Sequence, residues 1–138
     1  MSLFEPNKDF KVRGVVLKLL NSNCPELVPE IEDTRSDKRA NLAIVVAVVP
    51  VENGKIQGNE AFTAVTKDFS SSGVSVVTER PLPFDHAILG FRMDGEIVFL
   101  LAEARHVAPM GGGLFQVGFQ LLEVVSTGDY PGLEAVRF

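Results

Sequence analysis

The spacing of hydrophobic positions near the start of the chain differs from the spacing in the rest. Five apolar residues recur there at intervals of three and four, which is the period of one helix face. They are Val12, Val15, Val16, Leu19 and Leu20. Asn7 or Asp9 can cap the start of such a helix, and Pro25 follows its end. The pattern therefore predicts one amphipathic helix over about residues 8–21.

From residue 40 onward the pattern is typical of β-structure. Asn53-Gly54 and Asp94-Gly95 are dipeptides of type I′ hairpin turns, and Gly111-Gly112-Gly113 marks a third hairpin. The β-rich runs between the turns are Asn41–Pro50, Ala61–Lys67, Val74–Glu79, His86–Met93, Glu96–Val107 and Leu114–Val125. Six strands joined mostly by short hairpins predict an all-β fold, an antiparallel meander closed into a barrel. The fifth run is long for one strand, so a bulge or bend is expected within it.

These patterns divide the chain into three parts. Residues 1–33 form an N-terminal helical extension and an acidic, proline-containing linker over residues 24–33, which is expected to be solvated. Residues 34–125 form the barrel domain, and residues 126–138 form one helical turn or a tail. The helix either packs on the barrel of its own chain or offers a surface to a partner protein or to a second copy in a homodimer.

Composition excludes several classes of function. The chain has 138 residues and a formal net charge of −5, so a basic face for DNA or RNA is not expected. No apolar run reaches the roughly 18 residues of a membrane span, and no signal peptide is visible. Cys24 is the only cysteine, which excludes an internal disulfide and fits a cytoplasmic location. Its side chain is either a small apolar filler or a reactive thiol.

Two short segments carry residues suited to an anionic guanine nucleotide. Arg35 and Arg39 precede the first strand, and their guanidinium groups can bind phosphate or guanine, or stack on a base. Asp68, Ser70 and Gly73 follow the second strand and offer acceptors for the guanine edge, a hydroxyl for phosphate, and a position that tolerates positive φ or close backbone approach. Neighbouring antiparallel strands place the entry of one and the exit of the other on one rim. The two segments are therefore expected to converge.

The pair Arg35-x-x-x-Arg39 and Asp68-x-Ser70-x-x-Gly73 resembles the RxxxR and (D/N)xSxxG motifs of PilZ domains. The segment 115–121 also resembles the late strand of that family, and the resemblance spans roughly residues 34–125. It implies a six-stranded antiparallel β-barrel of PilZ type that binds cyclic di-GMP as its ligand, with no other cofactor. By the same resemblance, both arginines contact phosphate and guanine, Asp68 and Ser70 contact the guanine edge and its surroundings, and Gly73 shapes the loop. Many relatives carry a basic residue where this chain has Thr34, which leaves the ligand stoichiometry open.

The expected function is a non-enzymatic receptor domain that reports the level of cyclic di-GMP to an unidentified partner protein. A protein–protein adaptor with weak or no nucleotide binding is the first alternative, and a small barrel enzyme that binds flavin or another nucleotide is the second. Arg105 is a further candidate for ligand contact. No nucleophile, base and acid combination points to catalysis. His86 and His106 are too far apart in sequence to indicate a metal site.

Overall fold

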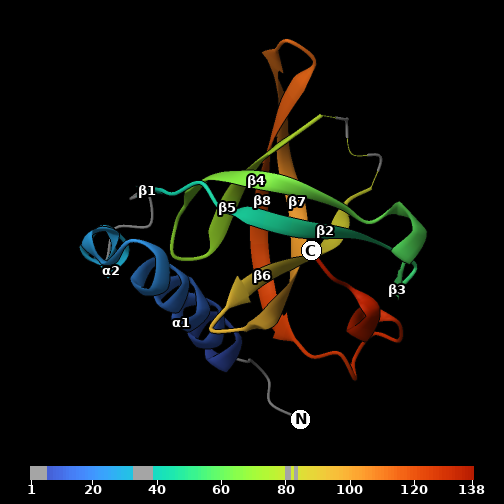
Figure 1. Ribbon diagram of the computed structural model, residues 1–138, viewed down its shortest axis with the longest axis horizontal. Coiled ribbons are helices and arrows are strands. Elements are labelled where there is room, and N and C mark those ends of the chain that lie inside the picture. Colours follow the sequence, from blue (N-terminus) through green and yellow to red (C-terminus); the bar gives the residue numbers. More distant parts are fainter. Residues whose placement is uncertain (1–5, 33–38, 80–81, 83) are drawn as a thin grey trace.

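The protein is a closed six-stranded antiparallel β-barrel with a helix against one side (Figure 1). The computed structural model describes residues 6–32, 39–79, 82 and 84–138. The six long strands are β2 (Val45–Glu52), β4 (Phe62–Phe69), β5 (Gly73–Thr78), β6 (His86–Met93), β7 (Glu96–Gly111) and β8 (Leu114–Val125). They are hydrogen-bonded in the order β2-β4-β5-β8-β7-β6, and β6 pairs with β2 to close the ring. The predicted number of long strands and their antiparallel pairing are confirmed.

The order of the strands differs from the predicted meander. β5 pairs with β8 rather than with β6, and β6 returns to pair with β2. The segment 79–85 connects β5 to β6 and contains Pro81 and Pro83 in place of a hairpin dipeptide. Proline has no backbone N–H to give to a ladder, so this segment is poorly suited to a tight hairpin. The predicted meander is therefore wrong at the connection between β5 and β6.

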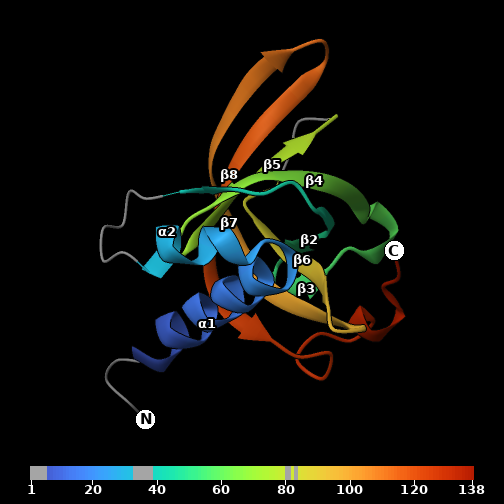
Figure 2. The ribbon, with the colours of Figure 1, turned by 60° about the vertical axis from the view of Figure 1, so that its left-hand side comes forward.

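The glycine turns and the irregularity of β7 agree with the sequence. Asn53 and Asp94 have φ of 53°, and the glycine after each also has positive φ, as type I′ turns require. The first of these turns joins β2 to the short strand β3 (Lys55–Ile56). β7 and β8 form a long hairpin that projects beyond the barrel (Figure 2), and their register shifts at three places. The bulge expected in β7 is therefore present.

Helix α1 (Pro6–Asn23) packs its apolar stripe against the barrel, mainly on β8. Val12, Val16, Leu19 and Leu20 are buried in the main core, and Val15 lies beside them. Lys8 adds an ion pair of 2.9 Å from its Nζ to Oε2 of Glu123 on β8. Packing on the barrel of the same chain is thus the alternative that the structure shows. None of the helices within the described ranges is long and apolar enough to cross a membrane.

The solvated linker expected over residues 24–33 is wrong for its described part. It forms a 3-10 turn, η1 (Pro25–Leu27), and a short helix, α2 (Val28–Glu32). Ile31 of α2 is only 1% exposed, and its carbonyl accepts a hydrogen bond of 3.4 Å from Arg13. Ile31 is buried in the core and the partly buried Leu27 and Val28 pack against it, which the surrounding prolines and acidic residues did not indicate.

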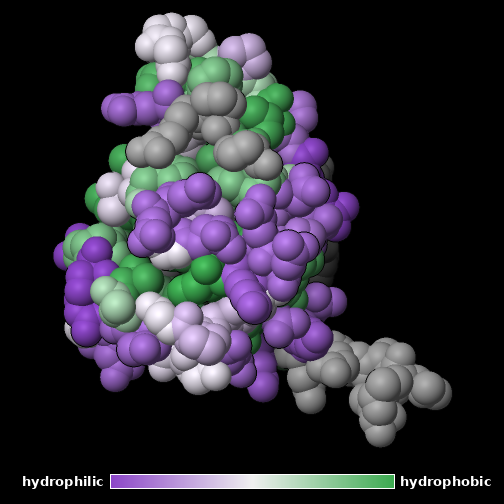
Figure 3. Space-filling view, turned by 90° about the vertical axis from the view of Figure 1, so that its right-hand side faces the viewer, coloured by the Kyte–Doolittle hydropathy of each residue, from purple (hydrophilic) through white to green (hydrophobic). Residues whose placement is uncertain are grey.

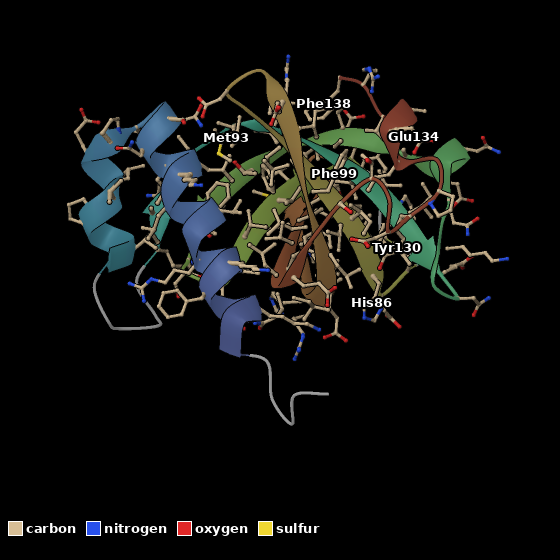
Figure 4. The ribbon with its side chains drawn as sticks, turned by 90° about the horizontal axis from the view of Figure 1, so that it is seen from below. His86, Met93, Phe99, Tyr130, Glu134 and Phe138 are labelled. Atoms are coloured by element: carbon tan, nitrogen blue, oxygen red, sulfur yellow. The ribbon has the colours of Figure 1, made fainter. Side chains whose placement is uncertain are left out.

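The C-terminal segment covers one end of the barrel. It contains a single 3-10 turn, η3 (Leu133–Ala135), so of the two alternatives the helical turn is observed. Leu133 is fully buried and packs with Val49, Ile88, Phe99 and Val125 in a second core cluster. Figure 4 shows Tyr130, Glu134 and Phe138 of this segment lying over the barrel end that contains Phe99. On the adjoining face, near β3, hydrophilic residues dominate (Figure 3).

Candidate functional site

Arg39, the described end of the first motif segment, meets the second motif segment beside the short strand β1 (Ala40–Asn41). β1 pairs antiparallel with the end of β4, with Ala40 opposite Phe69 and Asn41 opposite Asp68. Between β1 and β2 the backbone stays bonded to β4, because the Leu42 N–H donates to the Lys67 carbonyl and the Thr66 N–H donates to the Ile44 carbonyl. The Thr66 hydroxyl also donates to the Leu42 carbonyl and accepts from the Ile44 N–H. Figure 1 shows β1 beside β4. Arg39 immediately precedes β1 and is therefore held at the end of β4, as expected from two antiparallel neighbours that share a rim.

Arg39 is fixed by two side chains from two different strands. Its Nε and Nη2 both approach Oδ1 of Asp68 at 2.7 Å, and Nη2 also donates to Oγ of Ser75 at 3.2 Å. The Arg39 side chain is 44% exposed while that of Asp68 is 10% exposed. A pair this exposed adds about 1 kcal/mol or less to folding stability. The main effect of the ion pair is therefore to fix the position of the Arg39 guanidinium group. The Nη1 atom of that group takes part in none of these contacts.

A β-bulge at Lys67 places Asp68 and Ser75 on the outer face of the barrel. β4 and β5 pair as Thr66↔Val76 and then as Asp68↔Ser75, so Lys67 is the extra residue. One added residue turns the following side chains to the opposite face. Phe69 consequently points into the core and is fully buried, while Asp68 and Ser75 lie outside, covered by Arg39.

The Ser70–Gly73 turn is tightly packed against β8. The Ser70 N–H donates to the Gly73 carbonyl at 2.9 Å, and the Ser70 side chain is buried. A Cβ on Gly73 would lie 3.0 Å from the Phe119 carbonyl oxygen and 3.1 Å from Ser70 Oγ. Gly73 does not adopt positive φ, so of the two reasons for a glycine here, close backbone approach is the one observed.

The structure brings together Arg39 and Asp68, with Ser70 and Gly73 in the adjoining turn. Arg35 lies outside the described residues, so its place in the site stays a prediction. Arg105 is the bulged residue of β7; its Nε approaches Oε1 of Glu103 at 2.7 Å, and its side chain is 60% exposed. It is three strands away from Asp68, about 14 Å at the usual strand spacing.

Sequence reasoning missed two residues of this surface. Ser75, which holds Arg39, is a single polar residue between Val74 and Val76, and that contrast was the only signal in the sequence. Lys67, the bulged residue, reaches across β5 so that its Nζ lies 3.3 Å from Oε1 of Gln116. Lys67 adds a second cationic group to the outer face that carries Arg39.

Other polar clusters offer less for ligand binding. His86 Nε2 lies 3.9 Å from Oε2 of Glu103. No group of three or more His, Cys, Asp or Glu side chains in the described ranges could hold a metal ion. A cavity of about 370 Å³ beneath the C-terminal segment is lined chiefly by apolar groups such as Ile97, Phe99 and Val136. Its polar lining residues are Glu96, Thr127, Glu134 and Arg137, so two of its three charged groups are carboxylates, which repel an anionic ligand.

The Cys24 thiol donates a hydrogen bond of 3.1 Å to Oε2 of Glu26, and this bond raises the pKa of Cys24 above its ordinary value. A raised pKa lowers the thiolate fraction near neutral pH, and the thiolate is the reactive form. We expect Glu26→Gln to lower the Cys24 pKa and to speed alkylation by iodoacetamide at pH 8. The difference should vanish at a pH well above both pKa values, where both proteins are thiolate. Equal rates for both proteins at pH 8 would contradict the assignment.

Comparison with known proteins leaves the family of this chain open. No protein family matches the sequence, and no curated protein matches it either. Among solved structures, the inhibitor of motility MotI/DgrA of Bacillus subtilis is similar, at 15% identity and a TM-score of 0.47. The similarity covers 70% of this chain and 46% of that chain, so it spans less than half of the matched protein.

Proposed function

We propose that this chain is a PilZ-like receptor domain for cyclic di-GMP. The observation that carries the proposal is the Arg39–Asp68 ion pair of 2.7 Å, which joins the two motif segments across 29 residues of sequence. This contact supports the proposal because the family resemblance requires residues of both motifs to line one site, and Arg39 and Asp68 each belong to one of them. Arg39 contributes a guanidinium group whose Nε and Nη2 are anchored, which leaves the Nη1 edge to meet a phosphate or a guanine.

The surroundings of Arg39 support an anionic ligand. Lys67 lies on the same outer face, and Gly73 keeps the turn beside Ser70 compact. A local cationic site of this kind is compatible with the overall charge of −5, because salt screens distant exposed charges beyond about 8–10 Å. The proposal assigns no catalytic step and no cofactor to the chain. Ligand binding would act on an unidentified partner protein.

Calorimetric titration with cyclic di-GMP tests the proposal. We expect the wild type to bind, and Arg39→Ala to weaken binding by about 1–3 kcal/mol, or roughly 5- to 150-fold, because one guanidinium fork is lost. Arg35→Ala should weaken binding to a similar degree. The matched control is Arg137→Ala: this guanidinium binds carbonyls of Glu134 and Val136 in the C-terminal segment, so affinity should not change.

Two results would count against the proposal. If the wild type gives no heat of binding at cyclic di-GMP concentrations up to millimolar, the chain is not a receptor for this ligand. If both Arg39→Ala and Arg35→Ala bind with the affinity of the wild type, cyclic di-GMP binds at another place on the chain and this site assignment is wrong. Thermal unfolding of each variant separates a loss of binding from a loss of folding.

A protein–protein adaptor is the second candidate function, and one observation favours it. Phe10 on α1 is 79% exposed, an unusual position for a large aromatic side chain. A wild type that does not respond to cyclic di-GMP but forms a stable complex that Phe10→Ala disrupts would favour the adaptor.

A further inference from the structure

One row of residues on the outer face extends from the Arg39 cluster across the barrel. Cross-strand partners in an antiparallel sheet carry their side chains on the same face. Asp68 on β4 is opposite Ser75 on β5, Ser75 is opposite Gly118 on β8, and Gly118 is opposite His106 on β7. His106, 31 residues beyond Ser75 in sequence, thus lies in the row that holds Arg39.

The bulge in β7 is what brings His106 onto this row. β7 and β8 pair as Ala104↔Phe119 and then as His106↔Gly118, so Arg105 is the extra residue. Phe119 is buried in the core, whereas His106 is exposed, as expected once the extra residue has changed the face. The two bulges, at Lys67 and at Arg105, therefore direct the two ends of the row to the same side of the barrel.

Gly118 leaves the middle of the row without a side chain. A Cβ built on Gly118 would lie 3.6 Å from the Cβ of His106, an ordinary contact, so glycine is not required there by crowding. The strip of backbone between Ser75 and His106 is two strand spacings wide, about 10 Å. It is bounded by a hydroxyl that binds Arg39 at one side and by an imidazole at the other.

We propose that Gly118 and His106 form a base subsite: a nucleobase lies on the Gly118 backbone and contacts the His106 imidazole, while a phosphate of the same ligand lies at Arg39. The inference rests on the proposed function, and it deepens that function by assigning the second half of the ligand. An imidazole can stack on a purine as other aromatic side chains do. The distance from Ser75 to His106 suits a ligand with more than one base. A ligand with a single base held beside Asp68 would not extend across β8 to His106.

The chain contains only two histidines, so tag-free protein gives a direct test. In a proton–carbon spectrum of the histidine ring CH groups, cyclic di-GMP should shift the signals of His106 and leave those of His86 nearly unchanged. His86 lies on β6, beyond β7 from the row, and is the matched control. The His106→Ala variant assigns the two sets of signals.

Calorimetry on three variants completes the test. His106→Ala and Gly118→Val should each weaken cyclic di-GMP binding about tenfold, the first by removing a stacked ring and the second by filling the strip. His86→Ala should bind as the wild type does. If the wild type binds while both row variants keep its affinity and the His106 signals do not move, the subsite is overturned and the receptor function stands. If the wild type does not bind, both are overturned.

Discussion

Phe69→Ala is expected to lower the free energy of unfolding by about 3–5 kcal/mol, because the change deletes a buried aromatic ring and leaves a cavity. Phe69 is fully buried at the end of β4, and its ring centroid lies 5.8 Å from that of Phe91, with an angle of 52° between the ring planes. The same residue follows Asp68 directly, so its anchorage in the core also fixes the strand end that holds Arg39.

Urea unfolding followed by far-ultraviolet circular dichroism measures this effect, since the chain has no tryptophan and a single tyrosine. The matched control is Phe10→Ala, which removes the same ring from a side chain that is 79% exposed. That variant should stay within about 0.5 kcal/mol of the wild type. A loss below about 1 kcal/mol in Phe69→Ala would show that its ring is not part of a close-packed core.

The strands and turns could be predicted because their signals are local. Asn53-Gly54 and Asp94-Gly95 identify turns by their own backbone preference, and the runs between them have the composition of strands. The strand order could not be obtained in this way. Whether β5 pairs with β6 or with β8 depends on a long-range connection through residues 79–85, and nothing in the composition of those residues specifies its destination.

The helical extension shows the same limit. The apolar stripe of α1 was visible because four of its buried residues repeat with the helix period. The burial of Ile31 could not be predicted, because a helix as short as α2 has no period to detect and the acidic residues around Ile31 favour solvent. Its burial depends on α1 and α2 packing together, which is a tertiary effect.

For the site, residue types and topology predicted that Arg39 and Asp68 lie close together, but not how the surrounding side chains are arranged. The convergence of Arg39 with Asp68 follows from antiparallel neighbours sharing a rim, and the structure has it. The parts played by Ser75 and His106 depend on two bulges, at Lys67 and Arg105. A bulge changes which face every later residue occupies, and simple alternation along the sequence does not reveal it.

Deletion of Lys67 is expected to destabilise the protein without turning Asp68 or Phe69 to the other face. Without the extra residue, Thr66 stays opposite Val76 and Asp68 stays opposite Ser75, so uninterrupted alternation keeps Asp68 outside and Phe69 in the core. The deletion does remove the Lys67 carbonyl, which accepts a hydrogen bond of 3.3 Å from the Leu42 N–H beside β1. We therefore expect the deletion variant to fold and to lose about 1–3 kcal/mol in urea titration, the cost of leaving such a group without its partner.

Lys67→Ala is the control, because it keeps the extra backbone residue and removes only the exposed hydrogen bond from Nζ to Gln116. Its stability should lie within about 0.5 kcal/mol of the wild type. Circular dichroism during urea titration compares the two variants under identical conditions. An unfolded deletion variant would contradict this expectation, because Asp68 and Phe69 would then have failed to keep their faces without the extra residue. A deletion as mild as the alanine replacement would show that the bond from Leu42 to the Lys67 carbonyl does not help to hold β1, and with it Arg39, at the end of β4.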